Sequence, residues 1–291
     1  MKFFITGGGG QLAFAFQRLF KEEDLPFTIY SRQELDITDI SRVRRRIHED
    51  QPNVIINCAA WNDIDGAEQN WRDAYLVNAI GPKNLAIAAE EQNIPLVTFS
   101  SDYVFNGKSV RSWTIADTPD PINVYGRTKL LGEDFVKNHI HRFLIVRISW
   151  LFGPEGKEES NFLKQVLRLS REQNELKVVS DQISSPTYAP DLAERVMDLL
   201  SLRAWGVYHL SCSGRCSKYD WASFALKELG VTKNIYQVQS DEFRPIAQRP
   251  SMSALDPFPL DTLGIYMPRW EDATLRFLKS IGQKNGDIDD A

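Results

Sequence analysis

Short apolar runs alternate with helix-like segments through the first half of the chain. The expected strands span residues 2–6, 26–30, 53–60, 94–101 and 143–149. They are continuously apolar, without the every-second-residue polar pattern of a half-exposed strand. Strands of this kind are buried on both faces, as in parallel sheets that are covered by helices on both sides. The pattern therefore predicts a doubly wound parallel α/β sheet.

Segments with helical spacing separate these strands, at residues 11–23, 39–50 and 73–92. Asp39 and Ser41 are candidates to cap the second of them. The crossovers between parallel strands should be right-handed. After about residue 150 the alternation loosens, and we expect helices at 161–173, 190–202, 218–230 and 268–281 and strands at 175–180 and 206–211.

The composition is that of a soluble globular protein. The 291 residues are 43% hydrophobic and 25% charged, with a net charge of −5, which does not favour nucleic-acid binding. The basic run SRVRRRIHED has acidic neighbours, so we interpret it as a solvated helix face. No signal peptide and no membrane-spanning stretch is expected.

The three cysteines, Cys58, Cys212 and Cys216, are too few and too scattered for a disulfide framework. Cys212 and Cys216 have no histidine pair beside them, so no zinc site is expected. Together with the missing signal peptide, this favours a reducing cytoplasm.

Four consecutive glycines, Gly7 to Gly10, lie where the first strand turns into the first helix. They are either a flexible hinge or a phosphate cradle. In a doubly wound sheet this turn binds the pyrophosphate of a dinucleotide, with amide groups of the helix N-terminus facing the anion. Gly7 would form the tight turn and Gly10 the close approach, with Ala13 as the third small residue. Gly8 and Gly9 are interpreted as variable positions.

The end of the second strand bears on the choice of cofactor. An acid there favours NAD, whereas an arginine suits the 2′-phosphate of NADP. This chain has Arg32 at that point, with Glu34 and Asp36 slightly later. The arrangement favours NADPH and leaves NADH open as a second cofactor.

Tyr125 and Lys129 are four residues apart, which places them on one face of a helix. A free tyrosine has a pKa of about 10, and we expect the lysine ammonium to lower it toward the working range of a proton donor. Ser101 follows the fourth strand, at the edge of the sheet where ligands bind. Its hydroxyl could polarise a carbonyl group.

These motifs make the chain resemble the extended short-chain dehydrogenase/reductases, and within them the dTDP-4-dehydrorhamnose reductases. The resemblance covers nearly the whole chain. It rests on the segments GGGGQLA, ELDITD, VIINCAAWNDIDGAE, VNAIGPKNLA, SSDYVFNG, PINVYGRTKLLGE, VRISWLFG, DQISSPTYAPDLA and RPSMSALD, in this order.

The resemblance implies a role for each matching residue. Tyr125 would donate the proton, Lys129 would assist it, and Ser101 stands where the family usually has threonine. Asn78 resembles an asparagine that supports a proton relay. The residues implied at the cofactor are Gly10, Gln11, Leu12, Asp36, Ile37, Ala60, Trp61, Asn62 and Phe99. The residues implied at the sugar nucleotide are Ser101, Asp102, Tyr125 and Trp150, and we expect Arg249, in the later lobe, as a further contact with the nucleotide.

Residues 1–150 would then form a dinucleotide-binding Rossmann domain, to which about 186–211 return. Residues 151–185 and 212–281 would form a smaller substrate-binding lobe, and 282–291 a flexible tail. The family implies a dTDP-sugar as substrate and leaves a homodimer open. Some members have a magnesium-linked dimer, but Ala15 offers no carboxylate at the corresponding position, so no metal is expected.

The implied activity is NADPH-dependent reduction of the 4-keto group of a dTDP-deoxysugar. Two alternatives remain. Sister enzymes dehydrate or epimerise sugar nucleotides, but here Asp102 is followed by Tyr103 instead of the second carboxylate of a dehydratase. A regulatory subunit of methionine adenosyltransferase also resembles this branch, and would bind a nucleotide without turnover.

Overall fold

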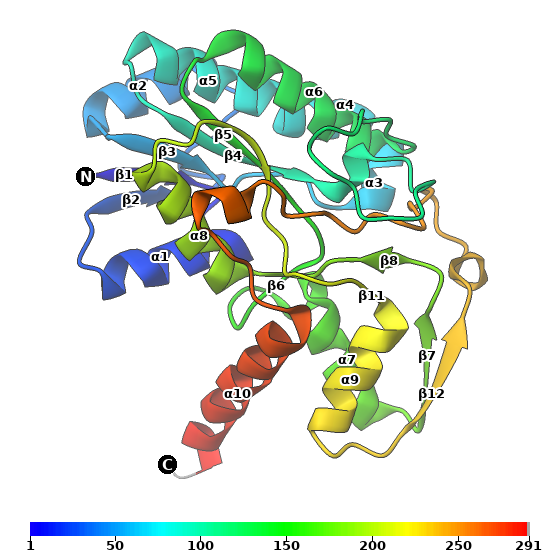
Figure 1. Cartoon of the computed structure of the whole chain (residues 1–291). Helices are drawn as coiled ribbons and strands as arrows, with labels where there is room; N and C mark the ends of the chain where they lie inside the picture. Colours follow the sequence, from blue (N-terminus) through cyan, green and yellow to red (C-terminus); the bar gives the residue numbers. More distant parts are fainter. Residues whose placement is uncertain (290–291) are drawn as a thin grey trace.

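A six-stranded parallel sheet forms the centre of the protein, in the order β10-β5-β4-β3-β1-β2 (Figure 1). The computed structural model describes the backbone of residues 1–289, and the side chains of these residues apart from 160 and 283–289. The strands of the sheet are β1 (Phe3–Thr6), β2 (Phe27–Tyr30), β3 (Val54–Asn57), β4 (Leu96–Ser101), β5 (Phe143–Ile148) and β10 (Gly206–His209).

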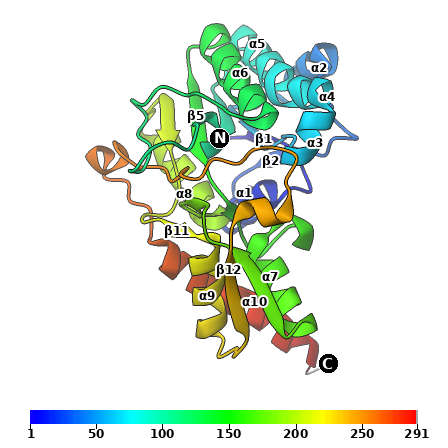
Figure 2. The same cartoon turned by 90° about the vertical axis from the view of Figure 1, so that its right-hand side faces the viewer.

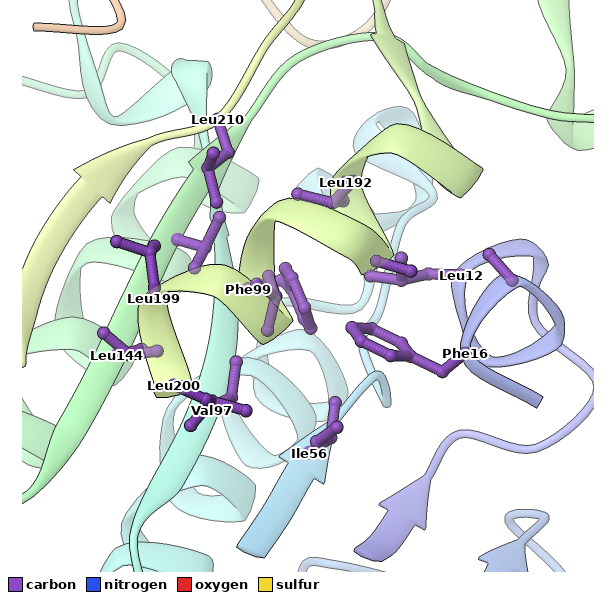
Figure 3. Packing of buried hydrophobic residues seen from close by; sticks show 14 of the residues in the cluster. Leu12, Phe16, Ile56, Val97, Phe99, Leu144, Leu192, Leu199, Leu200 and Leu210 are labelled. Atoms are coloured by element: carbon purple, nitrogen blue, oxygen red, sulfur yellow. The ribbon is translucent and has the colours of Figure 1, made fainter. Parts of the chain in front are cut away.

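Helices cover both faces of this sheet. One face packs against α1 (Gln11–Glu22) and α8 (Ala189–Ser201), in a core that includes Leu12, Phe16, Phe99 and Leu192 (Figure 3). The other face carries α2 (Ile40–Asp50), α5 (Gly81–Glu91) and α6 (Val124–His139) (Figure 1). Because both faces are buried, the strands need apolar residues throughout. The predicted doubly wound fold is confirmed.

The helix predicted over 73–92 is interrupted. After α3 (Ile64–Gln69) the chain forms α4 (Trp71–Tyr75), then a five-residue π-helical segment η1 (Leu76–Ile80), and then α5. A π segment admits an extra residue per turn and often lies at a functional site. Here it contains the buried Asn78.

A smaller lobe lies beside one end of the sheet (Figure 2). Its core is built on Trp221, Phe152 and Phe277. Its main elements are α7 (Phe162–Glu172), β7 (Glu175–Val179), α9 (Lys218–Glu228), β12 (Asn234–Val238) and α10 (Trp270–Asp289). Short strand pairs link the lobe to the sheet domain: β6 (Leu151–Phe152) with β9 (Thr187–Tyr188), and β8 (Ile183–Ser184) with β11 (Cys216–Ser217).

The ends of several elements agree with simple capping rules. Asp39 caps α2 by accepting hydrogen bonds from the backbone of Ser41 and Arg42.

The short 3-10 turns are η2 (Asp102–Val104), η3 (Glu158–Ser160), η4 (Ser240–Phe243) and η5 (Leu260–Leu263). Helix α10 extends to Asp289, beyond the predicted end at 281, and residues 290–291 of the expected tail lie outside the described residues.

Between residues 1 and 289, no helix combines the length and apolar character that crossing a bilayer requires. Within the same part of the chain, all three cysteines are free thiols, and no group of three or more His, Cys, Asp or Glu side chains could hold a metal ion.

Candidate active site

The glycine run forms a tight turn between β1 and α1. Gly7 has a φ of +73°, and a Cβ there would lie 2.6 Å from the backbone of Cys58 and Ala59. The Gly10 amide donates to the Gly7 carbonyl at 3.1 Å. Gly10 precedes α1 without a side-chain cap, so the first amide groups of α1 remain available to an anion. The hinge interpretation is not supported.

Gly8 and Gly9 are not the variable positions that we expected. Gly9 has a φ of +91°, which disfavours residues with a side chain, and an added Cβ would meet nothing within 4 Å. At Gly8 an added Cβ would lie 3.1 Å from the backbone of Tyr30 and Ser31. The turn thus presents bare backbone to open space at Gly9, while Gly8 packs against the end of β2.

Arg32 and Asp36 lie in the segment that follows β2. Arg32 is exposed. Burial opposes ionisation of Asp36, but hydrogen bonds from Thr38 and the charges of Arg32 and Arg42 outweigh it and lower the pKa of this carboxyl group. The side chain of Ile37 is buried. Asn84, on α5, donates to the carbonyl groups of Ile37 and Thr38 at 2.9 and 3.0 Å and so fixes this segment.

Asn78 holds the segment after β3, where Ala60, Trp61 and Asn62 lie. Its side-chain oxygen accepts from the Trp61 amide at 2.9 Å, and its nitrogen donates to the Trp61 carbonyl at 3.1 Å and to the Thr128 hydroxyl at 3.2 Å. The amide of Asn78 therefore links this segment to α6. These contacts give Asn78 a positioning role in this structure.

Three residues predicted at the cofactor have side chains that point elsewhere. Leu12 and Phe99 belong to the buried core (Figure 3). The Gln11 side chain donates to the Leu151 carbonyl at 3.0 Å and accepts from Asn161 at 3.0 Å. Any contact of these three residues with a cofactor would involve their backbone, as at a phosphate-binding helix N-terminus.

Ser101 and Tyr125 are brought together at the carboxyl end of β4. Ser101 is the last residue of β4, and its hydroxyl lies close enough to the phenol of Tyr125 to lower the pKa of that phenol, against the effect of burial. Tyr125 lies in the first turn of α6 and is partly buried. Tyr103 packs edge-on against it, with ring centroids 5.8 Å apart. Two hydroxyl groups thus converge where ligands of parallel sheets bind.

Lys129 lies one turn further along α6 and is buried. Its ammonium group donates to the Phe99 carbonyl at 2.6 Å. Burial lowers the pKa of Lys129 to about 8, although the carboxylate of Glu133 opposes this shift. Glu133 forms a buried ion pair with Arg147, 2.7 Å between Nη2 and Oε2.

The expected lowering of the Tyr125 pKa by Lys129 is not what the structure shows. Burial raises the pKa of Tyr125 to about 12, the charge of Asp102 adds to this, and the hydrogen bond with Ser101 opposes it. The reason is that the Lys129 ammonium contacts the Phe99 carbonyl. In this structure Tyr125 is therefore held in its protonated form, the form that a proton donor requires.

The position of α6 depends on close packing at its N-terminus. Asn123 caps the helix by accepting from the Gly126 amide at 2.8 Å. A Cβ on Gly126 would lie 2.1 Å from the Tyr103 carbonyl oxygen, so only glycine allows α6 to approach the segment after β4 so closely. This contact sets the distance between Tyr125 and Ser101.

Trp150 and Lys218 lie on the side of the smaller lobe. The Trp150 ring stacks on Trp221 at 6.0 Å, and the backbone of Trp150 has a φ of +41°. The Lys218 ammonium lies 5.6 Å from the Trp150 ring centroid and 6.0 Å from that of Phe162. Burial lowers the pKa of Lys218 to about 8. The sequence contains no pattern that would have identified Lys218.

Arg249 approaches the site from the C-terminal segment. Its guanidinium group binds both carboxylate oxygens of Asp65, at 2.8 and 2.7 Å, and donates to the Ala247 carbonyl at 2.7 Å. The arginine lowers the pKa of Asp65 to about 2. The pair joins the C-terminal segment to α3, and the predicted contact of Arg249 with the substrate would add to this role.

Known proteins resemble this chain over nearly its whole length. Residues 1–282 match the family model described as RmlD substrate binding domain. The chain is 36% identical to the spore coat polysaccharide biosynthesis protein SpsK of Bacillus subtilis, covering 96% of this chain and 97% of that protein. It is 34% identical to a dTDP-4-dehydrorhamnose reductase of Sinorhizobium fredii, covering 97% and 98%.

Solved structures agree with these matches. The dTDP-4-dehydrorhamnose reductase of Bacillus anthracis, in complex with NADP, superposes with a TM-score of 0.91 at 38% identity, covering 95% of this chain and 98% of that one. Both the sequence and the architecture are thus similar over nearly the full length. The chain belongs to the RmlD substrate-binding domain family, as its glycine turn and its Ser101, Tyr125 and Lys129 had indicated.

Proposed function

We propose that this protein reduces the 4-keto group of dTDP-4-dehydro-L-rhamnose to give dTDP-L-rhamnose, with NADPH as the reductant. The observation that carries the proposal is the pair of hydroxyl groups, Ser101 and Tyr125, at the carboxyl end of β4, with Lys129 one helical turn away. The relatives named dTDP-4-dehydrorhamnose reductase support the substrate, and the name of the SpsK relative supports a role in polysaccharide biosynthesis.

The residues around the glycine turn fit NADPH. The backbone at Gly9 faces open space, the first turn of α1 lacks a side-chain cap, and Arg32 lies beyond the neighbouring strand. The first two features suit a pyrophosphate. Arg32 suits a 2′-phosphate. The NADP complex of the Bacillus anthracis relative supports the same cofactor. When bound, NADPH supplies the hydride that reduces the carbonyl carbon.

The protein's own residues then act on the carbonyl oxygen. Tyr125 donates its phenolic proton to this oxygen, so that a new O–H bond forms and a phenolate remains. Ser101 donates a hydrogen bond to the same oxygen and stabilises the charge that develops on it. Lys129, one helical turn along α6, rests with its ammonium group on the Phe99 carbonyl, and it would assist by turning its positive charge toward the phenolate that forms. The smaller lobe, with Trp150 and Arg249, would hold the sugar nucleotide against these groups.

The residue after Asp102 supports reduction over dehydration. Elimination of water requires a second acid or base, and the position after Asp102 holds Tyr103, whose pKa is raised by burial. A neutral phenol of this kind is a poor base at neutral pH. Carbonyl reduction needs one proton donor only, and Tyr125 provides it.

Oxidation of NADPH in the presence of dTDP- and UDP-linked 4-keto-sugars tests this function. We expect turnover with dTDP-4-dehydro-L-rhamnose and at least a hundredfold loss of kcat for Tyr125→Phe, with little change in NADPH affinity. Tyr208→Phe is the matched control, because Tyr208 is a buried tyrosine on β10. No turnover with any keto-sugar would favour the regulatory alternative, and a fully active Tyr125→Phe would contradict the role of Tyr125.

A further inference from the structure

The side chain of Gln11 reaches from the glycine turn to the smaller lobe. Gln11 is the first residue of α1 and is 9% exposed. Its side-chain nitrogen donates to the Leu151 carbonyl at 3.0 Å, and its side-chain oxygen accepts from the Asn161 side chain at 3.0 Å. The two partners lie 140 and 150 positions away in the sequence. One side-chain amide therefore joins the start of α1 to two distant points of the chain.

Each of these two partners is the sequence neighbour of an aromatic residue. Leu151 follows Trp150, and Asn161 precedes Phe162. Both aromatic rings stack on Trp221, with ring centroids 6.0 Å apart for Trp150 and 5.4 Å apart for Phe162. The glutamine amide thus holds the backbone next to two of the three rings in this stack.

The backbone conformation of Trp150 gives one of these hydrogen bonds a particular weight. Trp150 has a φ of +41°, a conformation that persists in a residue with a large side chain only where the surroundings hold it. The hydrogen bond from Gln11 to the Leu151 carbonyl is one such contact. Trp150 is also the ring that we expect at the sugar nucleotide. The bond to Leu151 therefore bears on how this ring is presented to the substrate.

Asn161 connects Gln11 to the start of α7. It is 0% exposed, and its side-chain oxygen caps α7 by accepting from the Lys164 amide at 3.2 Å. Its side-chain nitrogen donates to the Gly153 carbonyl at 3.0 Å as well as to Gln11. A Cβ on Gly156 would lie 2.9 Å from the Gln11 Cβ. The segment between β6 and α7 is therefore packed directly on the first residue of α1.

The other end of this connection lies where we expect the pyrophosphate of the cofactor. The backbone amide of Gln11 is among the first of α1, which have no partner within the helix, and Gly10 provides no side-chain cap. An anion bound there fixes the backbone of Gln11. The side chain then loses less freedom when it forms its two hydrogen bonds, so these bonds become more stable.

We propose that Gln11 is a positioning residue that couples the cofactor site to the sugar-nucleotide site. The cofactor at the glycine turn fixes Gln11, which in turn orders Leu151 and Asn161 and holds Trp150 ready for the sugar nucleotide. Coupling of this kind is reciprocal, so a bound sugar nucleotide also strengthens cofactor binding. The inference rests on the proposed function, because it requires both ligands.

Direct contact between the two bound ligands is the competing explanation for any coupling. In that case the cofactor alone would leave the smaller lobe unchanged, and the side chain of Gln11 would have no part in the coupling. Coupling through Gln11 predicts instead that the cofactor alone orders the backbone around Leu151 and Asn161. The two explanations can therefore be separated with one ligand and one variant.

Hydrogen exchange with NADP+ as the ligand tests the ordering step. In the unmodified protein, saturating NADP+ should slow amide exchange at residues 7–16 and also at 148–153 and 161–166, by about fivefold or more. Gln11→Met keeps the length of the side chain but removes its hydrogen bonds. In this variant NADP+ should still protect residues 7–16, and the protection at 148–153 and 161–166 should be lost.

Calorimetric titration with dTDP-L-rhamnose, the product of the proposed reaction, tests the coupling itself. Saturating NADP+ should tighten its binding about tenfold in the unmodified protein and less than about twofold in Gln11→Met. Without NADP+, the two proteins should bind dTDP-L-rhamnose equally well. A merely structural role of Gln11 would instead weaken binding by the same factor with and without NADP+, and this result would overturn the inference.

Asn161→Ser is a second variant, which serves also if Gln11→Met fails to fold. A serine still caps α7 but is too short to reach Gln11. NADP+ should then protect residues 148–153 as in the unmodified protein and no longer protect 161–166. Gln17→Met is the matched control, because Gln17 is a partly exposed glutamine on the same helix. It should keep both the protection and the tenfold coupling.

The remaining outcomes separate the inference from the proposed function. Protection of residues 7–16 without protection of 148–153 or 161–166 in the unmodified protein would overturn the inference and leave the proposed function intact. Full coupling in Gln11→Met would do the same and would favour direct contact between the ligands. If NADP+ protects no part of the chain, or dTDP-L-rhamnose does not bind, the proposed function is refuted and the inference falls with it.

Discussion

At the scale of single residues, Gly7 and Gly9 illustrate how one residue type serves two physical purposes. At Gly7 the φ of +73° coincides with a backbone approach that leaves no room for a Cβ, 2.6 Å from Cys58 and Ala59. At Gly9 the φ is +91°, but the space around it is open. The first glycine is required by packing and by conformation, the second by conformation alone.

Gly7→Ala and Gly9→Ala should therefore differ in their cost. Gly9→Ala should lower the free energy of unfolding by about 1–2 kcal/mol, the cost of a left-handed conformation. Gly7→Ala adds a collision with backbone and should cost more, and NADPH binding should be lost as well. Urea unfolding and titration with NADPH would measure both effects. Equal costs for the two variants would contradict this account of the turn.

At the scale of elements, the span from α4 through η1 to α5 carries two buried asparagines with parallel roles. Asn78, in the π segment, holds the backbone of Trp61 and the hydroxyl of Thr128. Asn84, in α5, holds the carbonyl groups of Ile37 and Thr38. The same helical span thus fixes the segments that follow β2 and β3.

The two asparagines should affect different kinetic constants. Asn84→Ala releases the segment with Asp36 and Ile37, which we expect at the cofactor, so KM for NADPH should rise about tenfold with kcat nearly unchanged. Asn78→Ala releases the link to α6, which carries Tyr125, so kcat should fall by a similar factor. Steady-state kinetics of both variants is the measurement, and each variant serves as the control for the other. The same pattern in both would argue against separate roles.

At the scale of the whole molecule, the sheet domain and the smaller lobe meet around the reaction centre. Serines from both parts surround Asp102, and the Arg249–Asp65 pair joins residues 184 positions apart. Each part also supplies a lysine close to this junction. Lys129 comes from α6 of the sheet domain and Lys218 from α9 of the lobe, and burial lowers the pKa of each to about 8.

Each of these lysines should contribute stability that grows as the pH rises above 8, whereas the three thiols, whose pKa is raised by burial, contribute in the opposite direction. Between about pH 8 and 10.5 each lysine is largely neutral in the folded state but still protonated when unfolded. At each lysine the unfolded state then binds more protons, so the contribution of that lysine to the free energy of unfolding increases with pH, by up to about 1.4 kcal/mol per pH unit. Below pH 8 the cost of burying the two charges is fully present.

Urea unfolding between pH 7.5 and 10 would measure this slope. Lys129→Met and Lys218→Met should each reduce it, whereas Lys279→Met, on α10, should not. An unchanged slope in Lys129→Met would contradict a buried, easily deprotonated lysine beside Phe99.

The sequence by itself determined the fold class and the turn at Gly7, and it predicted the chemistry of Ser101, Tyr125 and Lys129. Apolar periodicity reports burial along one element, and Tyr125 and Lys129 share a face because a helix repeats every 3.6 residues. The same local reasoning missed the π segment at Leu76–Ile80. The extra residue in this turn goes with the long-range contacts of Asn78, which no local pattern reports.

Only the tertiary structure decided which side chains meet. Asp102 accepts a hydrogen bond from Ser184, 82 positions away in the sequence. Burial raises the pKa of Tyr125, whereas the spacing to Lys129 had predicted a lower pKa. No periodic pattern in the sequence marks Asn84, Lys218 or the serines that donate to Asp102. A hydrogen bond between distant segments depends on how elements pack in space, and no local pattern encodes that packing.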